Sequence, residues 1–445
     1  MSLTRSLRSI ALGVAALGAL VLSSARAEAQ GDAAPSTDPL ANIVVTGTAG
    51  ERPLPKIIVV PSISPYLEDV TLRSVVRRDL ELSGEFDVLP DDKAPDGLWT
   101  SDRAVETKAF AAKGAEMIVR VSAKKLDDQR AELGAQAWLV AGGDTPIFDK
   151  HWEVPLDRVR IESHQVADLV LGALTGSNGG FYSHLTFASG TGTLRRIYRI
   201  DADGFDAKPV SPTEHVAIAP AYDPAGTLYW AASVNRDEYK VFRAGDPKPV
   251  PMNIKGSVYG LAWSRDGSRV AASIAQGSTI QLFAGPSLDK LELASPVNFA
   301  LRPAFSPTGK LAFSGSGKFG QRIHVDGKAV SPDGFFASAP TFCRHPDGIR
   351  LVFAVGVGKN TDLVATGESG GQLYRLTQNQ GSNGYPSCSP DGRLVAFFST
   401  RKGGEGPGLY VMRLDGGRPK RISTLSGDSI RWERLPPSQL VEKKK

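Results

Sequence analysis

The sequence predicts a small mixed α/β domain followed by a six-bladed β-propeller. A strand–turn–strand phrase recurs between residues 220 and 399, and its turn glycines stand at positions 226, 267, 309, 348 and 392. The intervals of 41, 42, 39 and 44 residues match the period of a four-stranded propeller blade. Before residue 178, strands alternate with helices, which is typical of a compact α/β domain.

The clearest copy of the phrase runs from Tyr385 to Ser399. Its turn is Pro390-Asp391-Gly392, because proline presets φ, aspartate bonds the backbone ahead of it and glycine accepts a positive φ. The flanking residues are apolar, β-branched or aromatic, which favours strands. Residues 185–189 form a sixth second strand, and residues 429–432 form a sixth first strand. The two should share one blade, which removes open sheet edges, so the propeller is expected over 179–435.

The α/β domain is expected over 42–178. Leu72, Val75, Val76 and Leu80 recur at helical spacing, and this helix should stop near Ser83-Gly84. Asp102 is expected to cap a second helix that runs to Lys113, and a third helix should span 161–174 before Gly176. Strands are expected at 43–45, 57–60, 86–89, 116–121, 131–140 and 147–154, with a hinge at 177–180.

The N-terminus has the pattern of a secretory signal peptide. Arg5 and Arg8 precede an apolar run over 10–22, which ends in Ala25-Arg26-Ala27 and is too short to span a bilayer. Cleavage after Ala27 or Ala29 is expected, followed by a flexible tail over 28–41, and residues 436–445 form a basic C-terminal tail. The formal charge of +5 falls to +2 without three leader arginines, too little to indicate nucleic-acid binding.

The two cysteines, Cys343 and Cys388, lie on the first strands of consecutive repeats. An exported protein tolerates disulfides, but the cysteines occupy offset positions within their repeats. Two buried free thiols are therefore the favoured interpretation, and a bridge stays open.

No catalytic, cofactor or metal residue is predicted. Residues 367–371 match G-x-S-x-G, but a strand rather than a helix follows them, so they should form a hairpin loop. The six histidines have no metal-ligand spacing and are expected to be ordinary polar surface or strand residues. The Asp-Gly pairs lack the remainder of a calcium loop.

The loops that precede each first strand should share one face around the propeller channel. They combine aromatic, hydrogen-bonding and small residues, a composition suited to protein recognition. The alternative is that they are solvated connectors, as most loops are. An exported peptidase of the propeller type and a saccharide-binding propeller are the other functional alternatives, although the α/β segment is too small for a hydrolase domain.

Three local phrases resemble one known family. They are Asp79-Leu80 with Ser83-Gly84-Glu85-Phe86, His164-Gln165-Val166-Ala167-Asp168 leading to Leu174-Thr175-Gly176, and Arg199-Ile200-Asp201-Ala202-Asp203-Gly204. With the order of signal peptide, α/β domain and six blades, the chain resembles the TolB family of the Tol–Pal cell-envelope system.

The resemblance implies a monomeric, non-enzymatic adaptor in the periplasm that maintains outer-membrane integrity and serves envelope constriction at division. It implies that the N-terminal segment Asn42, Ile43, Val44 and Val45 binds the inner-membrane protein TolA by adding a strand to a sheet edge. It also implies that the propeller face binds the peptidoglycan-associated lipoprotein Pal. The expected contacts are His215, Ser257, Tyr259, Leu301, Arg302, Phe336, Ser338, Asn383 and Asp428.

Overall fold

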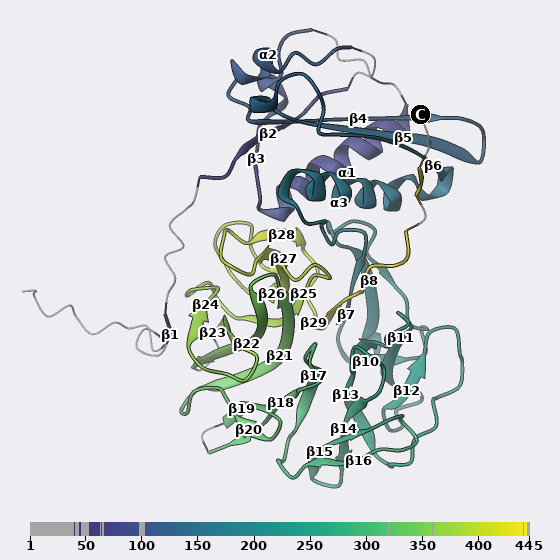
Figure 1. The fold of residues 1–445 in the computed structure, drawn as a ribbon. Coiled ribbons are helices and arrows are strands. Elements are labelled where there is room, and N and C mark those ends of the chain that lie inside the picture. The colour runs from purple at the N-terminus through teal and green to yellow at the C-terminus, as the bar shows by residue number, and fades with distance from the viewer. Residues whose placement is uncertain are drawn as a thin grey trace, which may run out of the picture. The chain divides into compact units, whose positions relative to one another are not determined.

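Six small antiparallel sheets surround one channel, as the propeller prediction requires (Figure 1). The computed structural model describes residues 40, 44–45, 53–62, 64, 66–97, 103–318, 320–357, 360–438 and 440–442. The expected signal peptide over 1–27 lies outside these residues, as does all of the expected tail except Leu40. Among the described residues, no helix is long and apolar enough to cross a membrane.

The blades follow the predicted repeat, and the innermost strands are β10, β13, β17, β21, β25 and β29. All five predicted turn glycines have positive φ, between 75° at Gly267 and 127° at Gly348. The blades are β7 (His184–Ser189), β8 (Arg196–Asp201) and β9 (Lys208–Pro209) with β29 (Asp428–Trp432); β10 (Val216–Tyr222), β11 (Leu228–Ser233) and β12 (Lys240–Arg243); β13 (Ser257–Trp263), β14 (Val270–Gln276), β15 (Thr279–Gly285) and β16 (Glu292–Ser295); β17 (Leu301–Phe305), β18 (Leu311–Gly317), β19 (Gly320–Val325) and β20 (Lys328–Ala329); β21 (Phe336–His345), β22 (Gly348–Val357), β23 (Asn360–Gly367) and β24 (Leu373–Arg375); and β25 (Asn383–Cys388), β26 (Leu394–Ser399), β27 (Gly408–Arg413) and β28 (Lys420–Ser423).

The ring closes as the sequence predicts. Strand β29 pairs with β7 in an antiparallel ladder, with Arg431 opposite Thr186 and Trp432 opposite Leu185. Because the last inner strand is paired with the first blade, neither strand is left as an open edge. The prediction of six blades, one of which is built from both ends of the propeller segment, is confirmed.

The N-terminal domain is a six-stranded sheet with helices on both faces. In β2, Ile57 and Val59 pack towards α1 and α3, whereas Ile58 packs on the opposite face near Phe110 of α2, as the two-residue strand period requires. The strand order is β3 (Asp87–Val88), β2 (Lys56–Val59), β4 (Met117–Lys125), β5 (Arg130–Leu139), β6 (Phe148–Pro155) and β30 (Val441–Glu442), and the helices are α1 (Leu67–Ser83), α2 (Thr107–Ala111) and α3 (Val159–Thr175) with short 3₁₀ turns η1 (Asp91–Lys93), η2 (Val140–Gly142), η3 (Leu156–Arg158) and, in the first blade, η4 (Gly192–Leu194).

The long helices end where the sequence predicts, at Gly84 and Gly176, whose φ values are 66° and 83°. The prediction for the second helix is wrong in length. Helix α2 has only five residues, its N-cap is Glu106, and the expected cap Asp102 lies outside the described residues. Thr107 explains the late start, because its backbone N–H and its hydroxyl both donate to Asp144 Oδ1, at 2.8 and 2.7 Å.

Two short terminal strands pair in places that the repeat pattern does not indicate. Strand β1 (Val44–Val45) lies parallel to β24 as a fifth strand of a propeller blade. Near the other end of the chain, β30 pairs with β6 of the α/β sheet, and Lys150 bonds Glu442 across this pair. Each terminal segment therefore adds to a sheet of the domain that is distant from it in sequence.

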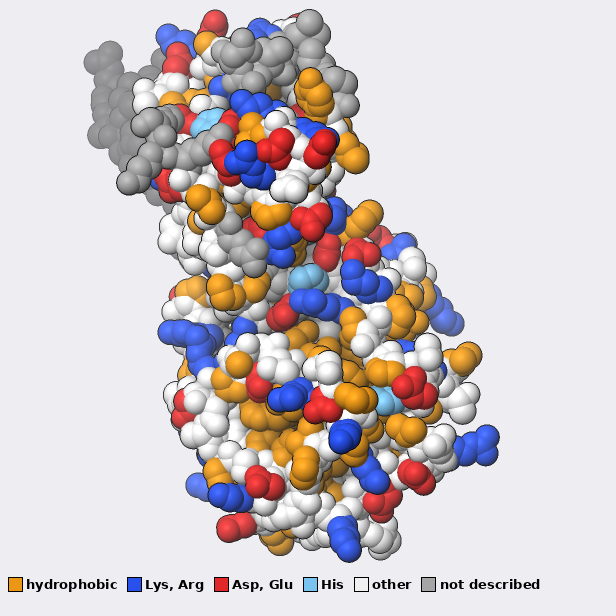
Figure 2. All heavy atoms as spheres, turned by 90° about the vertical axis from the view of Figure 1, so that its right-hand side faces the viewer, with side chains coloured by type: hydrophobic (Ala, Val, Ile, Leu, Met, Phe, Trp, Pro, Cys, Tyr) orange, Lys and Arg blue, Asp and Glu red, His pale blue; other side chains and the backbone are white. Residues whose placement is uncertain are grey.

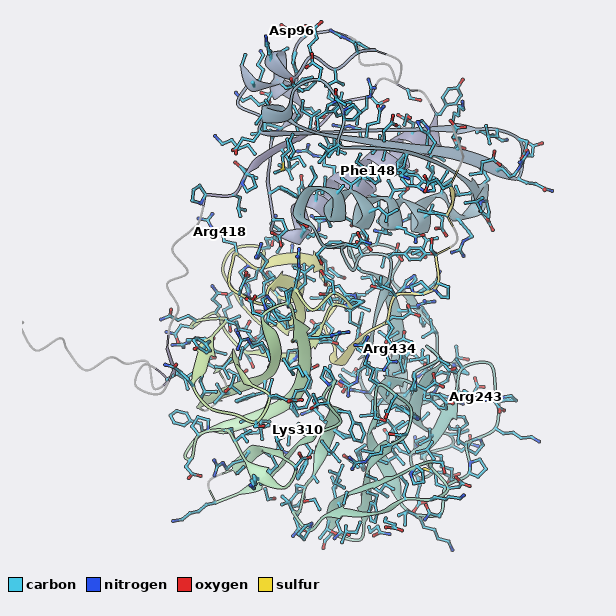
Figure 3. All side chains as sticks on the ribbon, in the orientation of Figure 1. Asp96, Phe148, Arg243, Lys310, Arg418 and Arg434 are labelled. Atoms are coloured by element: carbon cyan, nitrogen blue, oxygen red, sulfur yellow. A yellow bond between two sulfur atoms is a disulfide. The ribbon has the colours of Figure 1, made fainter. Side chains whose placement is uncertain are left out.

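Helices α1 and α3 lie on the side of the α/β sheet that faces the propeller (Figure 1). Glu85, which follows α1, forms ion pairs with Arg413 at 2.7 Å and with Arg393 at 3.5 Å. Arg434, labelled in Figure 3, follows β29 and donates to the carbonyls of Pro224 and Arg265, each at 3.3 Å. These contacts reach the turns between first and second strands and between third and fourth strands.

Candidate functional site

The beginnings of the six inner strands lie on the propeller face opposite the α/β domain. An inner strand runs from its preceding loop to the turn that joins it to the second strand. The α/β domain contacts the turn ends, through residues such as Arg393 and Arg413. The loops that carry the expected partner contacts are at the other end of the strands, so this face is not covered by the α/β domain.

Two of the expected contact residues are exposed aromatics at the start of inner strands. Tyr259 is 37% exposed and its ring lies 5.7 Å from that of Tyr239, while Phe336 is 40% exposed. The structure adds Phe299, which is 48% exposed in the loop before β17 and has a φ of 51°. The sequence signal for Phe299 is an aromatic residue in a loop that precedes an inner strand. Aromatic side chains dominate the energetics of protein interfaces.

Three other expected contacts are buried inside the blades. His215 accepts a hydrogen bond from Trp230 Nε1 at 3.1 Å and packs 4.2 Å from the Phe242 ring, and burial lowers its pKa. Asn383 donates to the Thr361 carbonyl at 3.2 Å, and Ser338 is 8% exposed. His215 and Asn383 bond neighbouring strands, and all three side chains are buried.

The remaining expected contacts are half-buried. Ser257 Oγ accepts from the Tyr239 N–H at 3.2 Å, and Leu301 begins β17. Asp428 accepts from Arg195 and from Ser429, the latter at 2.8 Å. Arg302 lies over the Tyr385 ring, with its guanidinium carbon 4.6 Å from the ring centroid. Of the nine expected residues, Arg302 lines a cavity between the inner strands.

The expected N-terminal binding segment is docked on the propeller. Val44 pairs with Leu373 and Val45 with Tyr374, while Asn42 and Ile43 lie outside the described residues. Leu40 is 3% exposed and packs in the core of the same blade. This segment therefore already makes a strand pairing within its own chain.

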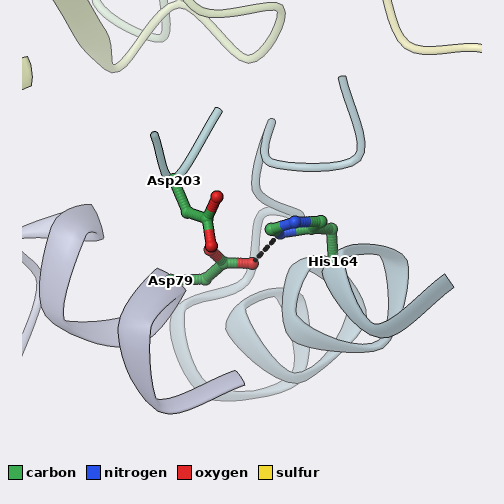
Figure 4. A group of neighbouring side chains, drawn as sticks. All are labelled: Asp79, His164 and Asp203. Atoms are coloured by element: carbon green, nitrogen blue, oxygen red, sulfur yellow. Dashed lines mark hydrogen bonds and ion pairs between the residues drawn. The ribbon is translucent and has the colours of Figure 1, made fainter. Parts of the chain in front are cut away.

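The expectation that all histidines are ordinary surface or strand residues is wrong for His164. It is fully buried on α3, and its Nδ1 lies 2.6 Å from Asp79 Oδ2 of α1 (Figure 4). Asp203, from the first propeller hairpin, completes a group whose ligand-type atoms lie within 4.8 Å of one another. The sequence signal was that Asp79 and His164 both lie on apolar helix faces, where a buried polar side chain needs a hydrogen-bond partner.

This group has the donor types of a metal site, but its charges are largely compensated by side chains. Arg160 donates to Asp203 Oδ2 at 2.6 Å and to Asp201 Oδ2 at 3.0 Å. Burial lowers the pKa of His164, but Asp79, Asp201 and Asp203 outweigh it and raise this pKa to about 10. The arrangement is an ionic network that joins α1, α3 and the propeller.

The expectation of free thiols is also wrong, because Cys343 and Cys388 form a disulfide. Their Cα atoms lie 5.4 Å apart on β21 and β25, the inner strands of neighbouring blades. The offset within the repeats does not keep the two cysteines apart.

The G-x-S-x-G segment over 367–371 lies between β23 and β24, as the hairpin prediction requires. Lys310 of the preceding blade contacts both of its polar side chains. Its Nζ donates to Ser369 Oγ and lies 3.7 Å from Glu368 Oε2. The loop therefore links two blades, and a nucleophile elbow would need a helix after the serine.

Comparison with known proteins agrees with this architecture. Residues 41–145 match the family model of the TolB amino-terminal domain. The chain is 27% identical over 164 residues to the Tol-Pal system protein TolB of Albidiferax ferrireducens, covering 35% of this chain and 36% of that protein. It is 26% identical over 153 residues to the corresponding protein of Polaromonas naphthalenivorans, covering 34% and 35%. The aligned segments thus span about a third of these relatives.

The fold has a counterpart over nearly its whole length. The crystal structure of TolB from Acinetobacter baumannii superposes with a TM-score of 0.68 at 18% identity, covering 86% of this chain and 97% of that one. The architecture defines a protein in which a mixed α/β domain precedes a six-bladed β-propeller. Residues 41–145 match the TolB amino-terminal domain, and the predicted resemblance to the TolB family is confirmed.

Proposed function

We propose that this protein is a non-enzymatic periplasmic adaptor of a Tol–Pal system. The observation that carries the proposal is the TolB amino-terminal domain at residues 41–145, joined to a propeller whose free face exposes Tyr259, Phe299 and Phe336. In this role the face binds a Pal-like lipoprotein, and the N-terminal segment binds a TolA-like inner-membrane protein.

The character of the surface supports protein recognition over nucleic-acid binding. Figure 2 shows acidic and basic side chains interspersed with apolar ones over the face in view. The formal charge of the whole chain is only +5, from 52 basic and 47 acidic residues. A mixed surface with exposed aromatics suits a protein partner, whereas nucleic acid selects a basic stripe.

The pairing of β1 with β24 supports the role of the N-terminal segment. A segment that adds a strand to a sheet edge in its own chain has the backbone geometry to do so on a partner. The docked and partner-bound arrangements exclude each other where the partner pairs with the same edge of the segment as β24 does. Pal binding is therefore expected to change the affinity for TolA if it alters the docking of β1.

The first test is the affinity between the mature protein and the periplasmic domain of its own Pal-like lipoprotein. Tyr259→Ala and Phe336→Ala are each expected to weaken binding by about tenfold, the effect of a modest aromatic hot spot. Leu293→Ala is the matched control, because Leu293 is 54% exposed on the outermost strand of a blade. A folded protein that does not bind the lipoprotein would contradict the proposal.

A further inference from the structure

The inner strands carry a ring of strained bulges around the channel. Five of the six inner strands have a non-glycine residue with φ between 51° and 57° at the bulge: Ala219, Arg302, Ala339, Tyr385 and Ser429. A bulge re-aims the side chain it carries, and positive φ in bulky residues is uncommon outside functional positions. Arg302 and Tyr385 are the bulky members of this ring.

Four of these bulges line one cavity in the channel. Its walls come from β17, β21, β25 and β29, the inner strands of successive blades. Arg302 and Arg431 belong to this lining, together with Pro340 and Tyr385. We call this the channel cavity.

Neither arginine has an acidic partner in the described part of the chain. Arg302 donates to Tyr385 Oη at 3.4 Å, and Arg431 donates to the carbonyl of Ile430 at 3.2 Å. Asp428 lies nearby in sequence, but it forms its ion pair with Arg195. Burial and, to a smaller extent, the positive charge of Arg302 lower the pKa of Arg431 to about 10.

Two half-buried cations that line one cavity repel each other unless an opposite charge joins them. We propose that Arg302 and Arg431 bind an oxyanion or a carboxylate that places one oxygen in the channel cavity, whose volume of about 10 Å³ admits a group the size of a water molecule. Guanidinium forks match the geometry of carboxylate and phosphate oxygens. The Tyr385 hydroxyl accepts from Arg302, so its own proton is available for the same anion.

The anion has two possible sources, a free solute and an acidic side chain of a protein that binds the propeller face. The chemistry of the site is the same for both. The proposed anion site consists of channel residues and does not depend on the adaptor role. Binding of a free anion can therefore be measured without a partner protein.

The test is isothermal titration of the full mature protein with inorganic phosphate and, separately, with acetate, at constant ionic strength set with chloride. Saturable binding is expected for the wild type. Arg302→Gln and Arg431→Gln should each lower the affinity by about tenfold or more, since each removes a charge-assisted hydrogen bond. Arg269→Gln is the control, because exposed Arg269 lies 5.1 Å from the Phe305 ring without lining the cavity.

A folding check keeps the variants interpretable. In chloride alone, neither cavity variant should unfold more easily than the wild type, because each removes an uncompensated cation. In phosphate, the wild type and Arg269→Gln should gain thermal stability by mass action, while the cavity variants should not. Equal phosphate stabilisation in all four proteins, or no binding in the wild type, overturns the proposal.

A competition experiment with the Pal-like domain distinguishes a free anion from a carboxylate of the partner. If phosphate weakens the binding of the Pal-like domain to the wild type but not to Arg302→Gln, the site binds a carboxylate of the partner. Phosphate that binds without competing assigns it to a free anion. Failure of the Pal-like domain to bind leaves the phosphate titration intact.

Discussion

His164 of α3 and Asp79 of α1 form a fully buried pair, with His164 Nδ1 2.6 Å from Asp79 Oδ2. Around them lie Arg160, Asp201 and Asp203, and burial, with a smaller contribution from the charge of Asp79, raises the pKa of the nearby Asp168 carboxyl group. The pair connects the two long helices, and Asp203 connects it to the propeller. Its protonation therefore couples the packing of the α/β domain to the propeller.

The raised pKa values of His164 and Asp79 both imply that the free energy of unfolding falls as pH rises. The pKa of His164 is raised from 6.5 to about 10, so its contribution is complete below pH 6.5 and is lost towards pH 10. Burial raises the pKa of Asp79 from 3.8 to about 7, so its contribution decreases between these values. His164→Gln should lower the free energy of unfolding by about 3–5 kcal/mol at neutral pH.

Urea unfolding of the wild type and His164→Gln across pH about 6 to about 9 checks this prediction. The variant should lose the His164 part of the pH dependence and keep the Asp79 part, whereas His151→Gln should keep both, since His151 is half-exposed on β6. The same slope against pH in all three proteins would show that His164 is not charged in the folded state.

The turn glycines differ in the space around them, which allows a matched comparison. A Cβ at Gly392 would lie 1.9 Å from the Arg344 carbonyl oxygen of the neighbouring blade, whereas a Cβ at Gly309 meets nothing within 4 Å. Both have positive φ, 78° and 90°. Gly309→Ala should cost only the conformational strain, about 1–2 kcal/mol, and Gly392→Ala clearly more. Thermal unfolding of the two variants measures this, and equal losses would mean that the neighbouring blade shifts freely.

Local patterns predicted the repeats well. The turn residues around Gly392 predict a tight turn, and Gly392 has positive φ. The spacing of Leu72, Val75 and Val76 predicts a helix, and all three residues lie in α1. The disulfide between Cys343 and Cys388 depends on how neighbouring blades pack, which no single repeat encodes.

The same reasoning separates the site residues. The exposure of Tyr259 follows from its loop, whereas the burial of His215 depends on Trp230 and Phe242 of the same blade. The convergence of Arg302 and Arg431 needed the closed ring, because they are 129 positions apart. The pairing of Val44 with Leu373 is likewise a contact between distant parts of the chain.

The disulfide predicts that oxidised protein is more stable than reduced protein. It closes a loop with a sequence separation of 45 and joins two inner strands of the ring. Replacing both cysteines with alanine should lower the free energy of unfolding by about 2–4 kcal/mol. Intact mass before and after reduction, with alkylation of free thiols, checks the bond itself. Rapid alkylation of the unreduced, unfolded protein would contradict it.

The ion pair between Glu85 and Arg413 predicts energetic coupling between the α/β domain and the propeller. The two side chains are about one-fifth and one-quarter exposed and lie 2.7 Å apart, and Arg413 also bonds Asp415 within its own turn. A double-mutant cycle with Glu85→Gln and Arg413→Gln isolates the contact between the domains from the local one. The coupling free energy should be about 1–2 kcal/mol, within the range for contacting residues.

The control cycle uses Arg243 and Asp246, an exposed pair at 3.6 Å within one blade, for which coupling below about 0.5 kcal/mol is expected. Limited proteolysis at residues 177–180 gives a second measurement, because loss of the Glu85 contacts should open the hinge before the blades unfold. Coupling no larger than in the control, with unchanged cleavage, would mean that the apolar packing of α1 and α3 alone holds the domains together.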